Sequence, residues 1–265
     1  CEQFGIEQPI FGFAHDISTV AAICNAGGLG VYGATRRFPD EIRNELAEIR
    51  SLVGDRPFGV DLVLPPGMPE HNSREAIEAH IPDEHRRFVQ SIKEKYDVPE
   101  PSGPGMRTRF IRSSEIEQEQ LEAVFESDVD LFACGIGAPR AAVDRAHELG
   151  KLTAALIGSP RHVHRALNAG VDLIVAQGYD AGAHTGPIGT FTLVPQIVDL
   201  AGDIPVLAAG GVATGRHLAA SLALGAQGVW TGTIWLTSAE HTAHMQPALV
   251  DKLLAATSAD TVVTR

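Results

Sequence analysis

One ten-residue stretch combines residue types that could bind a ligand and move a proton. Residues 177–186 read Gln-Gly-Tyr-Asp-Ala-Gly-Ala-His-Thr-Gly and directly follow 171–176, an apolar run of strand length. Glycines let a backbone approach a ligand closely. Gln177 could hydrogen-bond the edge of a heterocycle, and His184 could exchange protons near neutral pH. We therefore expect a functional loop here, with a purely structural His184 as the alternative.

Two further strand ends offer backbone N–H groups without obstructing side chains. Gly210 and Gly211 follow one apolar run, and Gly232 and Thr233 follow the next. Helices are expected to begin close behind both loops, and the dipole of a helix N-terminus favours an anion. A single glycine pair would indicate only a tight turn, but two such loops on neighbouring strands predict a phosphate site.

Eight apolar runs of strand length alternate with eight helical patterns along the 265 residues. Strict alternation implies a parallel sheet, and eight strand–helix units are the number that closes a barrel. An open, doubly wound sheet is disfavoured because the glycine-rich strand ends follow the last three runs rather than the first. The predicted fold class is therefore α/β, a (β/α)8 TIM barrel. The predicted strands are 9–14, 29–33, 56–64, 129–134, 152–157, 171–176, 205–209 and 228–231, and the predicted helices are 19–25, 38–52, 114–126, 139–149, 161–169, 191–201, 215–224 and 239–256.

The stretch from about 66 to 113, after the third strand, interrupts this alternation. It is rich in Pro, Glu, Arg and His, contains one helical pattern at 83–96, and is too polar and short to form a core of its own. We expect a helical and loop insertion within a single domain of residues 1–265, which acts as a lid or as a subunit contact in a homodimer. Residues 260–265 look like another strand or its loop, so the C-terminal end looks truncated.

The composition narrows the class of protein. A net charge of −12 makes nucleic acid and anionic membrane surfaces poor partners. No apolar run reaches the roughly 20 residues of a membrane-spanning helix. The three cysteines lack paired spacing, and the sequence contains no CxxC motif that would indicate a metal site. These features favour a cytoplasmic protein without a metal centre.

The motif at 177–186 closely resembles the Gln-Gly-x-Glu-Ala-Gly-Gly-His-x-Gly signature of the nitronate monooxygenase (2-nitropropane dioxygenase-like) family. The segments 25–30, 209–215 and 232–233 also match this family in order and spacing, so the resemblance covers nearly the whole chain except the insertion. It implies an FMN-binding TIM barrel. The family includes nitronate oxidases, NAD(P)H:quinone reductases and flavin-dependent enoyl-thioester reductases.

The resemblance also implies roles for individual residues. His184 matches the catalytic histidine, which in the nitronate oxidases is the base that takes the α-proton of a nitroalkane while the flavin accepts electrons. Gly211 and the segment 230–233 should hold the FMN phosphate. The full set of expected cofactor contacts is Gln177, Gly182, Gly210, Gly211, Trp230, Thr231, Gly232, Thr233, Asp61 and Ala14.

Three positions depart from the family pattern. The first strand ends in Ala14 and His15, where relatives usually carry Pro-Met beside the flavin. Asp61 stands where Asn is usual, and it can donate a hydrogen bond to the flavin only if it is protonated. Asp180 is one methylene shorter than the signature Glu. His15, Asp16 and Asp180 are therefore candidates to face the substrate, with helix capping as the alternative for Asp16.

The leading prediction is an FMN-dependent oxidoreductase that oxidises nitronates or nitroalkanes with O2. The alternative on the same fold is an NAD(P)H-dependent FMN reductase of a quinone or of an enoyl- or dienoyl-CoA thioester, which the insertion and the changes at His15 and Asp61 favour. Arg107, Arg109 and Arg112 in the insertion could meet such an anionic substrate or simply solvate a loop. An alternative of another class is a non-redox barrel, a lyase, isomerase or binding protein for a phosphate ligand.

Overall fold

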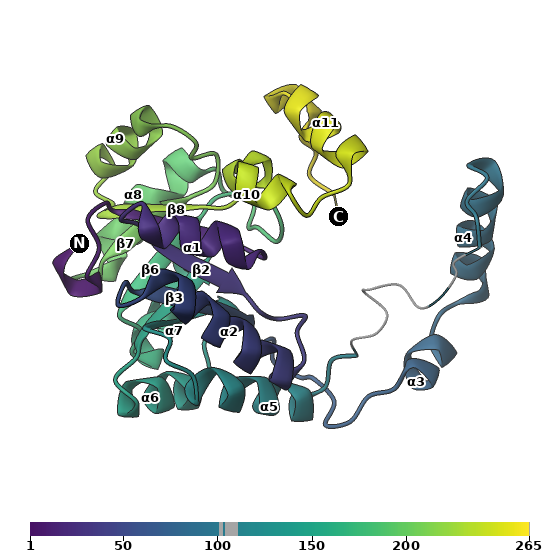
Figure 1. Cartoon of the computed structure of the whole chain (residues 1–265), viewed down its shortest axis with the longest axis horizontal. Coiled ribbons are helices and arrows are strands. Elements are labelled where there is room, and N and C mark those ends of the chain that lie inside the picture. Colours follow the sequence, from purple (N-terminus) through teal and green to yellow (C-terminus); the bar gives the residue numbers. More distant parts are fainter. Residues whose placement is uncertain (101–102, 104–110, 265) are drawn as a thin grey trace.

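Eight parallel strands close into a barrel with helices around it (Figure 1). The computed structural model describes residues 1–100, 103 and 111–264. The strands are β1 (Ile10–Ala14), β2 (Leu29–Gly33), β3 (Phe58–Val63), β4 (Leu131–Ile136), β5 (Leu152–Ile157), β6 (Leu173–Gln177), β7 (Val206–Ala209) and β8 (Gly228–Thr231). Each strand pairs with the next, and β8 pairs with β1, so the predicted (β/α)8 TIM barrel is confirmed.

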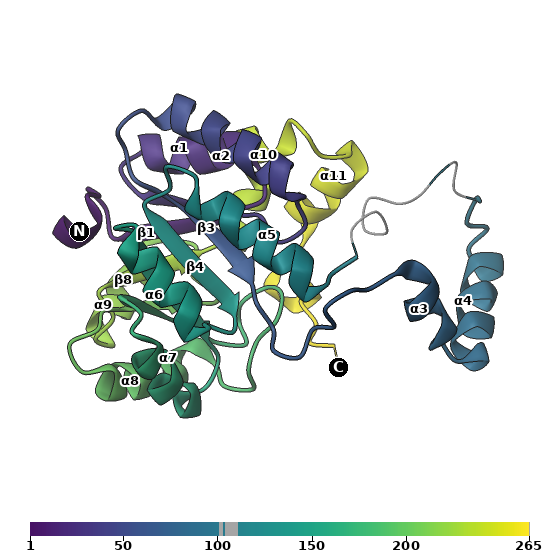
Figure 2. The ribbon, with the colours of Figure 1, turned by 90° about the horizontal axis from the view of Figure 1, so that it is seen from below.

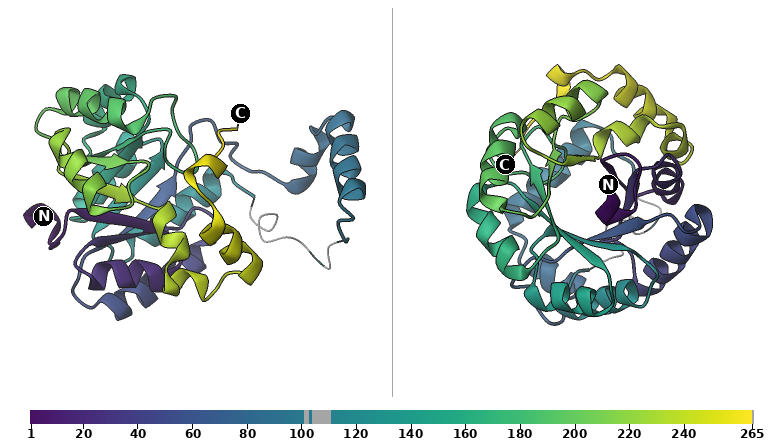
Figure 3. Two further views of the ribbon diagram at one scale, coloured as in Figure 1. Left: turned by 90° about the horizontal axis from the view of Figure 1, so that it is seen from above. Right: turned by 90° about the vertical axis from the view of Figure 1, so that its left-hand side faces the viewer.

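The helices that follow the strands surround the barrel (Figure 3). The α-helices are α1 (Ile17–Asn25), α2 (Pro39–Val53), α3 (Arg74–Ala79), α4 (Asp83–Lys95), α5 (Ser114–Phe125), α6 (Arg140–Glu148), α7 (Val163–Ala169), α8 (Thr190–Ala201), α9 (Gly215–Ala223), α10 (Ala239–Thr242) and α11 (Pro247–Ala255). The short 3-10 turns are η1 (Glu2–Phe4), η2 (Pro160–His162), η3 (Thr233–Thr237) and η4 (Ser258–Asp260).

Alternation along each strand separates an inner core from an outer one. In β3, Phe58, Val60 and Leu62 pack outward in one buried cluster with side chains of α1, α2 and α5. Gly59 and Asp61 between them therefore face the inside of the barrel. The inner cluster draws on residues from seven of the strands, including Val175, Leu207 and Trp230.

The end of the barrel where the strands begin is closed by apolar side chains. Phe4 and Ile6, from η1 and the turn after it, are buried in the same inner cluster. The ring of Phe4 meets the edge of Phe11 at a centroid distance of 5.3 Å. The N-terminus accordingly lies over this opening when the barrel is viewed end on (Figure 3). Any ligand must therefore enter from the opposite end, where the strands finish.

The predicted C-terminal helix 239–256 is wrong. The chain forms the two shorter helices α10 and α11 in its place, with a break before Pro247. Gln246 is extended, with φ −64° and ψ 129°, as the residue before a proline prefers, and Pro247 opens the first turn of α11. Of the two forms expected for 260–265, a strand or its loop, no strand forms within 260–264: Asp260 ends η4, and 261–264 are irregular chain.

The insertion after β3 projects beyond the carboxyl ends of the strands and away from the barrel (Figure 2). The predicted helix 83–96 forms as α4, and α3 precedes it; neither helix has a buried residue. The base of the insertion is held where it joins α5, since the backbone N–H of Ser114 donates to Pro69 O (2.9 Å). Arg112 contacts Glu117 and the Val63 carbonyl there, while Arg107 and Arg109 lie outside the described residues.

Candidate active site

The loops after β6, β7 and β8 meet at the open end of the barrel. A Cβ atom built on Gly210 would lie 2.6 Å from Thr190 Oγ1 and 2.9 Å from the backbone N of Ala181. A Cβ on Gly182 would lie 3.1 Å from Thr233 Oγ1. These distances show that the three glycine-rich loops singled out in the sequence form one continuous surface. Gly210 must be glycine for this approach.

Two successive left-handed residues turn the chain after β7. Gly210 has φ 106° and Gly211 has φ 71°, a conformation that favours glycine. Behind them α9 begins after Thr214, and η3 begins after Gly232 in the neighbouring loop, both without a side-chain cap. Helix starts of this kind keep backbone N–H groups available for an anion. This geometry suits the phosphate site expected here.

His184 is exposed at the mouth of the barrel. The side-chain amide of Gln177 donates to the carbonyl oxygen of His184 (3.0 Å), which ties the loop back to the end of β6. The preceding residue, Ala183, has φ 67°. Left-handed backbone costs a residue with a Cβ about 1 kcal/mol or more. The backbone that presents His184 is thus strained as well as tethered.

The Asp180 carboxylate binds the start of α8. Its Oδ2 accepts from the backbone N–H of Thr190 (2.7 Å), and the Thr190 hydroxyl donates to the Ala209 carbonyl (3.1 Å). Asp180 therefore positions the loop, and its other oxygen is the one left to face a substrate. Sequence reasoning missed Thr190, which has no signal beyond its place at the start of a helix.

His15 and Asp16, at the end of β1, have different surroundings. Asp16 caps α1, since its Oδ1 accepts from the backbone N–H of Thr19 (2.9 Å) and from its hydroxyl (3.0 Å). His15 is exposed; its Nδ1 lies 2.9 Å from the Gly33 carbonyl, and its ring meets the edge of Phe13 at 5.0 Å. A carbonyl can only accept, so Nδ1 must carry the proton of that bond. Nε2 of the neutral ring is then an acceptor at the mouth.

Asp61 points into the barrel and has no partner for one of its oxygens. The residue is 4% exposed, and Oδ2 is buried without a hydrogen bond. Burial raises the pKa of this carboxyl well above its usual range. Asp61 can therefore remain a neutral acid, the only form in which its carboxyl donates a hydrogen bond.

Three other expected cofactor contacts direct their side chains into the scaffold. Ala14 packs outward in the cluster that contains α1. Trp230 lies inside the barrel, stacked at 6.2 Å from Phe13. The Thr231 hydroxyl donates to the Phe11 carbonyl (3.0 Å). Ala14 and Thr231 could therefore contact a cofactor only through backbone atoms. Trp230 could also offer its indole inside the barrel.

Two cavities lie outside this mouth. One of about 290 Å³ is lined by residues of α1 and η3, and one of about 410 Å³ by residues of α2 and α5. Neither is lined by a residue expected to do chemistry, so the mouth of the barrel remains the candidate site. Among the described residues, His, Cys, Asp and Glu form no group of three that could hold a metal ion. No helix in the described part of the chain has both the length and the apolar character needed to cross a membrane.

Known proteins similar to this chain identify its family. A family model described as "Nitronate monooxygenase" matches residues 2–265. The chain belongs to the nitronate monooxygenase family. Family membership makes it a flavin-dependent oxidoreductase and removes the non-redox barrel from consideration.

Relatives in the family agree with this assignment. The Mycobacterium tuberculosis protein Rv1533, whose name describes a monooxygenase, is 43% identical over 280 residues, spanning 100% of this chain and 72% of its own length. A Staphylococcus saprophyticus protein named as a probable nitronate monooxygenase is 34% identical, over 83% of this chain and 61% of its own. The chain thus spans 61–72% of the length of these two relatives.

Solved structures of similar fold include two with 28% identity. FabK from Thermotoga maritima, as an M276A mutant, has a TM-score of 0.75 and covers 100% of this chain and 73% of its own. A nitroalkane oxidase from Streptomyces ansochromogenes has a TM-score of 0.72 and covers 92% of this chain and 72% of its own.

Proposed function

We propose that this protein binds FMN at the mouth of the barrel and oxidises nitronates or nitroalkanes with O2. The observation that carries the proposal is the convergence of three loops: the glycine pair Gly210 and Gly211, the contact of Gly182 with Thr233, and His184 on the same surface. An FMN suits these residues because the left-handed pair Gly210 and Gly211 and the uncapped start of α9 behind it leave backbone N–H groups for an anionic phosphate. The similarity to a nitroalkane oxidase supports the substrate class.

Different residues of the chain would bind the cofactor and transfer the proton. The backbone of Gly210, Gly211, Gly232 and Thr233 would hold the FMN phosphate. Gln177 would hydrogen-bond the ring system with the part of its amide that does not hold His184. When bound, the flavin supplies the two-electron acceptor.

His184 would act as the base for neutral nitroalkanes. An imidazole nitrogen of the exposed ring takes the α-proton of the nitroalkane. Nitronates have already lost this proton, so their oxidation requires only binding beside the flavin. The strained and tethered backbone at Ala183 keeps the imidazole at the mouth.

The direct test is flavin spectroscopy under anaerobic conditions. The purified protein should carry FMN or gain its spectrum when FMN is added. A nitronate should then bleach the flavin, and NADH or NADPH should not. A protein that never acquires a flavin spectrum would overturn the cofactor assignment, and bleaching by NAD(P)H alone would overturn the oxidase.

The second candidate is an NAD(P)H-dependent reduction of a quinone or of an enoyl- or dienoyl-CoA thioester. One observation favours it: Asp61 can remain a neutral acid inside the mouth. Reduction of such substrates needs a proton donor, whereas nitroalkane oxidation needs a base. Bleaching of the flavin by NADPH, followed by reoxidation with a quinone or an enoyl thioester, would establish this activity.

A further inference from the structure

Asp61 differs from the other carboxylates at the barrel strands. It is the only acidic side chain in the fully buried set of the described residues. Asp130, before β4, accepts from Arg50 and from the backbone N–H of Phe58. Asp172, before β6, accepts from the hydroxyl and the N–H of Thr153 and lies 2.9 Å from His147 Nε2. Asp61 has no comparable partner, and Oδ2 is sealed from solvent.

The surroundings of the Asp61 carboxyl include the backbone of β4 on one side and β2 with the His15 ring on the other. A Cβ on Gly135 of β4 would lie 3.0 Å from Oδ1 and 3.1 Å from Oδ2, so β4 passes directly beside both oxygens. On the other side β2 pairs Gly33 with Asp61. The Gly33 position is covered by the His15 ring, since a Cβ there would lie 2.5 Å from that imidazole.

Two titratable groups lie near the carboxyl, one on β4 and one directly after β1. Cys134 of β4 has a pKa raised by its own burial and also by the charge that Asp61 would carry. His15 lies over Gly33, at the mouth. Burial raises the pKa of Asp61, and no cation among the described residues lowers it. An ionised Asp61 would therefore be both desolvated and unpaired, which is costly.

We propose that Asp61 is held as a neutral carboxylic acid whose O–H donates a hydrogen bond to a ring acceptor atom of the bound flavin, an inference that rests on the flavin site proposed above. A buried polar atom without a partner in the free protein is satisfied when the ligand arrives. An acid that must stay protonated makes flavin affinity depend on pH. Asp61 is neutral at low pH, so affinity is full there and falls as pH rises through the pKa of the free protein.

Flavin binding as a function of pH tests this arrangement. The quenching of FMN fluorescence gives the dissociation constant for the wild type, Asp61→Asn and Asp61→Leu. In the wild type the constant should rise up to tenfold per pH unit once Asp61 of the free protein begins to ionise. Asp61→Asn keeps a permanent donor, so its constant should not follow this rise. Asp61→Leu should bind about tenfold more weakly than the wild type at low pH.

Infrared spectroscopy of the protein without flavin tests the protonation state independently. The C=O stretch of a protonated carboxylic acid should be present at neutral pH in the wild type and in Asp55→Asn, an exposed control, and absent in Asp61→Asn. A wild type without this band overturns the neutral acid. A wild type that binds FMN equally at all pH values overturns the hydrogen bond while leaving the flavin site intact. A protein that binds no FMN would contradict the proposed function itself, whatever its infrared spectrum shows.

Discussion

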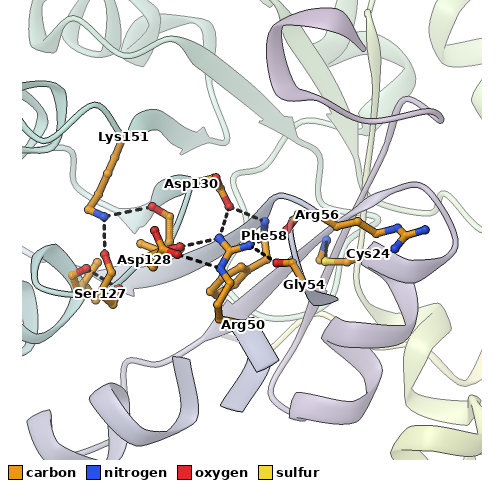
Figure 4. A network of polar contacts seen from close by, with 12 residues as sticks. Cys24, Arg50, Gly54, Arg56, Phe58, Ser127, Asp128, Asp130 and Lys151 are labelled. Atoms are coloured by element: carbon orange, nitrogen blue, oxygen red, sulfur yellow. Dashed lines mark hydrogen bonds and ion pairs between the residues drawn. The ribbon is translucent and has the colours of Figure 1, made fainter. Parts of the chain in front are cut away.

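The two ends of the barrel differ in how their charged side chains are paired. Where the strands begin, Arg50 of α2 donates to the carbonyls of Gly54 (2.8 Å) and Arg56 (2.9 Å) and to Asp130 Oδ2 (2.7 Å) (Figure 4). Its guanidinium also lies 4.7 Å from the centre of the Phe58 ring. Where the strands finish, Asp61 has an oxygen with no partner.

The groups that stabilise the fold and the groups expected to act on a substrate therefore lie at opposite ends of the barrel. The Arg50 network connects α2, the start of β3 and the loop before β4, and Lys151 extends it by donating to the carbonyls of Ser127 (2.6 Å) and Val129 (3.1 Å). Arg50 Nε makes no hydrogen bond and lies 3.3 Å from Asp128 Oδ2, but the other polar groups of this network are hydrogen-bonded and hold these elements in place. The other end keeps glycine loops, a strained residue and an unpaired acid, which is where barrel enzymes place their chemistry. Four substitutions test this contrast.

Replacing Arg50 should produce the largest loss of stability. Arg50→Ala removes the side-chain donor from three carbonyls and from Asp130, which keeps only the Phe58 N–H. The expected cost is about 3 kcal/mol, because Asp130 keeps partial access to water. Denaturant unfolding measures this. Arg43→Ala on the same helix is the control, since its exposed pairs with Asp40 and Glu126 should contribute little. Equal losses in both variants would contradict the importance of the network.

Replacing His184 should impair chemistry without impairing the fold. His184→Asn keeps the backbone carbonyl that Gln177 uses, so flavin binding should persist. Turnover of a neutral nitroalkane should fall by about 10²-fold because the base is lost. Turnover of the corresponding nitronate should change much less. A variant that oxidises both forms as well as the wild type would exclude His184 as the base.

Replacing Asp61 should change how stability depends on pH. The folded protein holds the Asp61 proton more tightly than the unfolded chain, whose pKa is about 3.9. Stability is therefore full below that value and is lost as pH rises toward the raised pKa, by up to about 1.4 kcal/mol per pH unit. Asp61→Asn without flavin should become more stable than the wild type as pH increases. Parallel curves of unfolding free energy against pH would refute this.

Relieving the strain at Ala183 should have the smallest effect. Ala183→Gly removes the Cβ from a residue with φ 67°, for an expected gain of up to about 1 kcal/mol in thermal unfolding of the flavin-free protein. Ala181→Gly in the same loop is the matched control, because Ala181 does not have positive φ and should lose stability instead. The same sign in both variants would show that the φ of Ala183 is not the cause.

Local patterns were enough to predict the barrel. All eight strands form within two residues of their predicted bounds, because apolar runs and the glycines that end helices are read directly from the chain. The failure at 239–256 had a visible signal, since Pro247 interrupts the apolar pattern and the residue before it avoids helical backbone. The convergence of the three glycine loops followed from the barrel topology.

The partners of individual side chains could not be predicted. Asp180 and Thr190 are ten positions apart, and only the folded loop brings the carboxylate to the start of α8. Alternation within β3 indicates that Asp61 faces inward. The lack of a hydrogen-bond partner for its carboxyl depends on the strand register, which sets Gly135 beside it. The roles of His184 and of the expected cofactor contacts stay predictions until flavin binding is measured.

The base of the insertion has a consequence for how this chain can be altered. Its two arms run side by side: the Ser114 N–H donates to Pro69 O (2.9 Å), and the Asn72 side chain donates to the Arg112 carbonyl (3.1 Å). Segments whose ends are adjacent and whose helices bury nothing can be exchanged with little disturbance to the framework. The stretch between 72 and 112 is thus a replaceable module, and substitution by a short turn should leave a barrel that still folds.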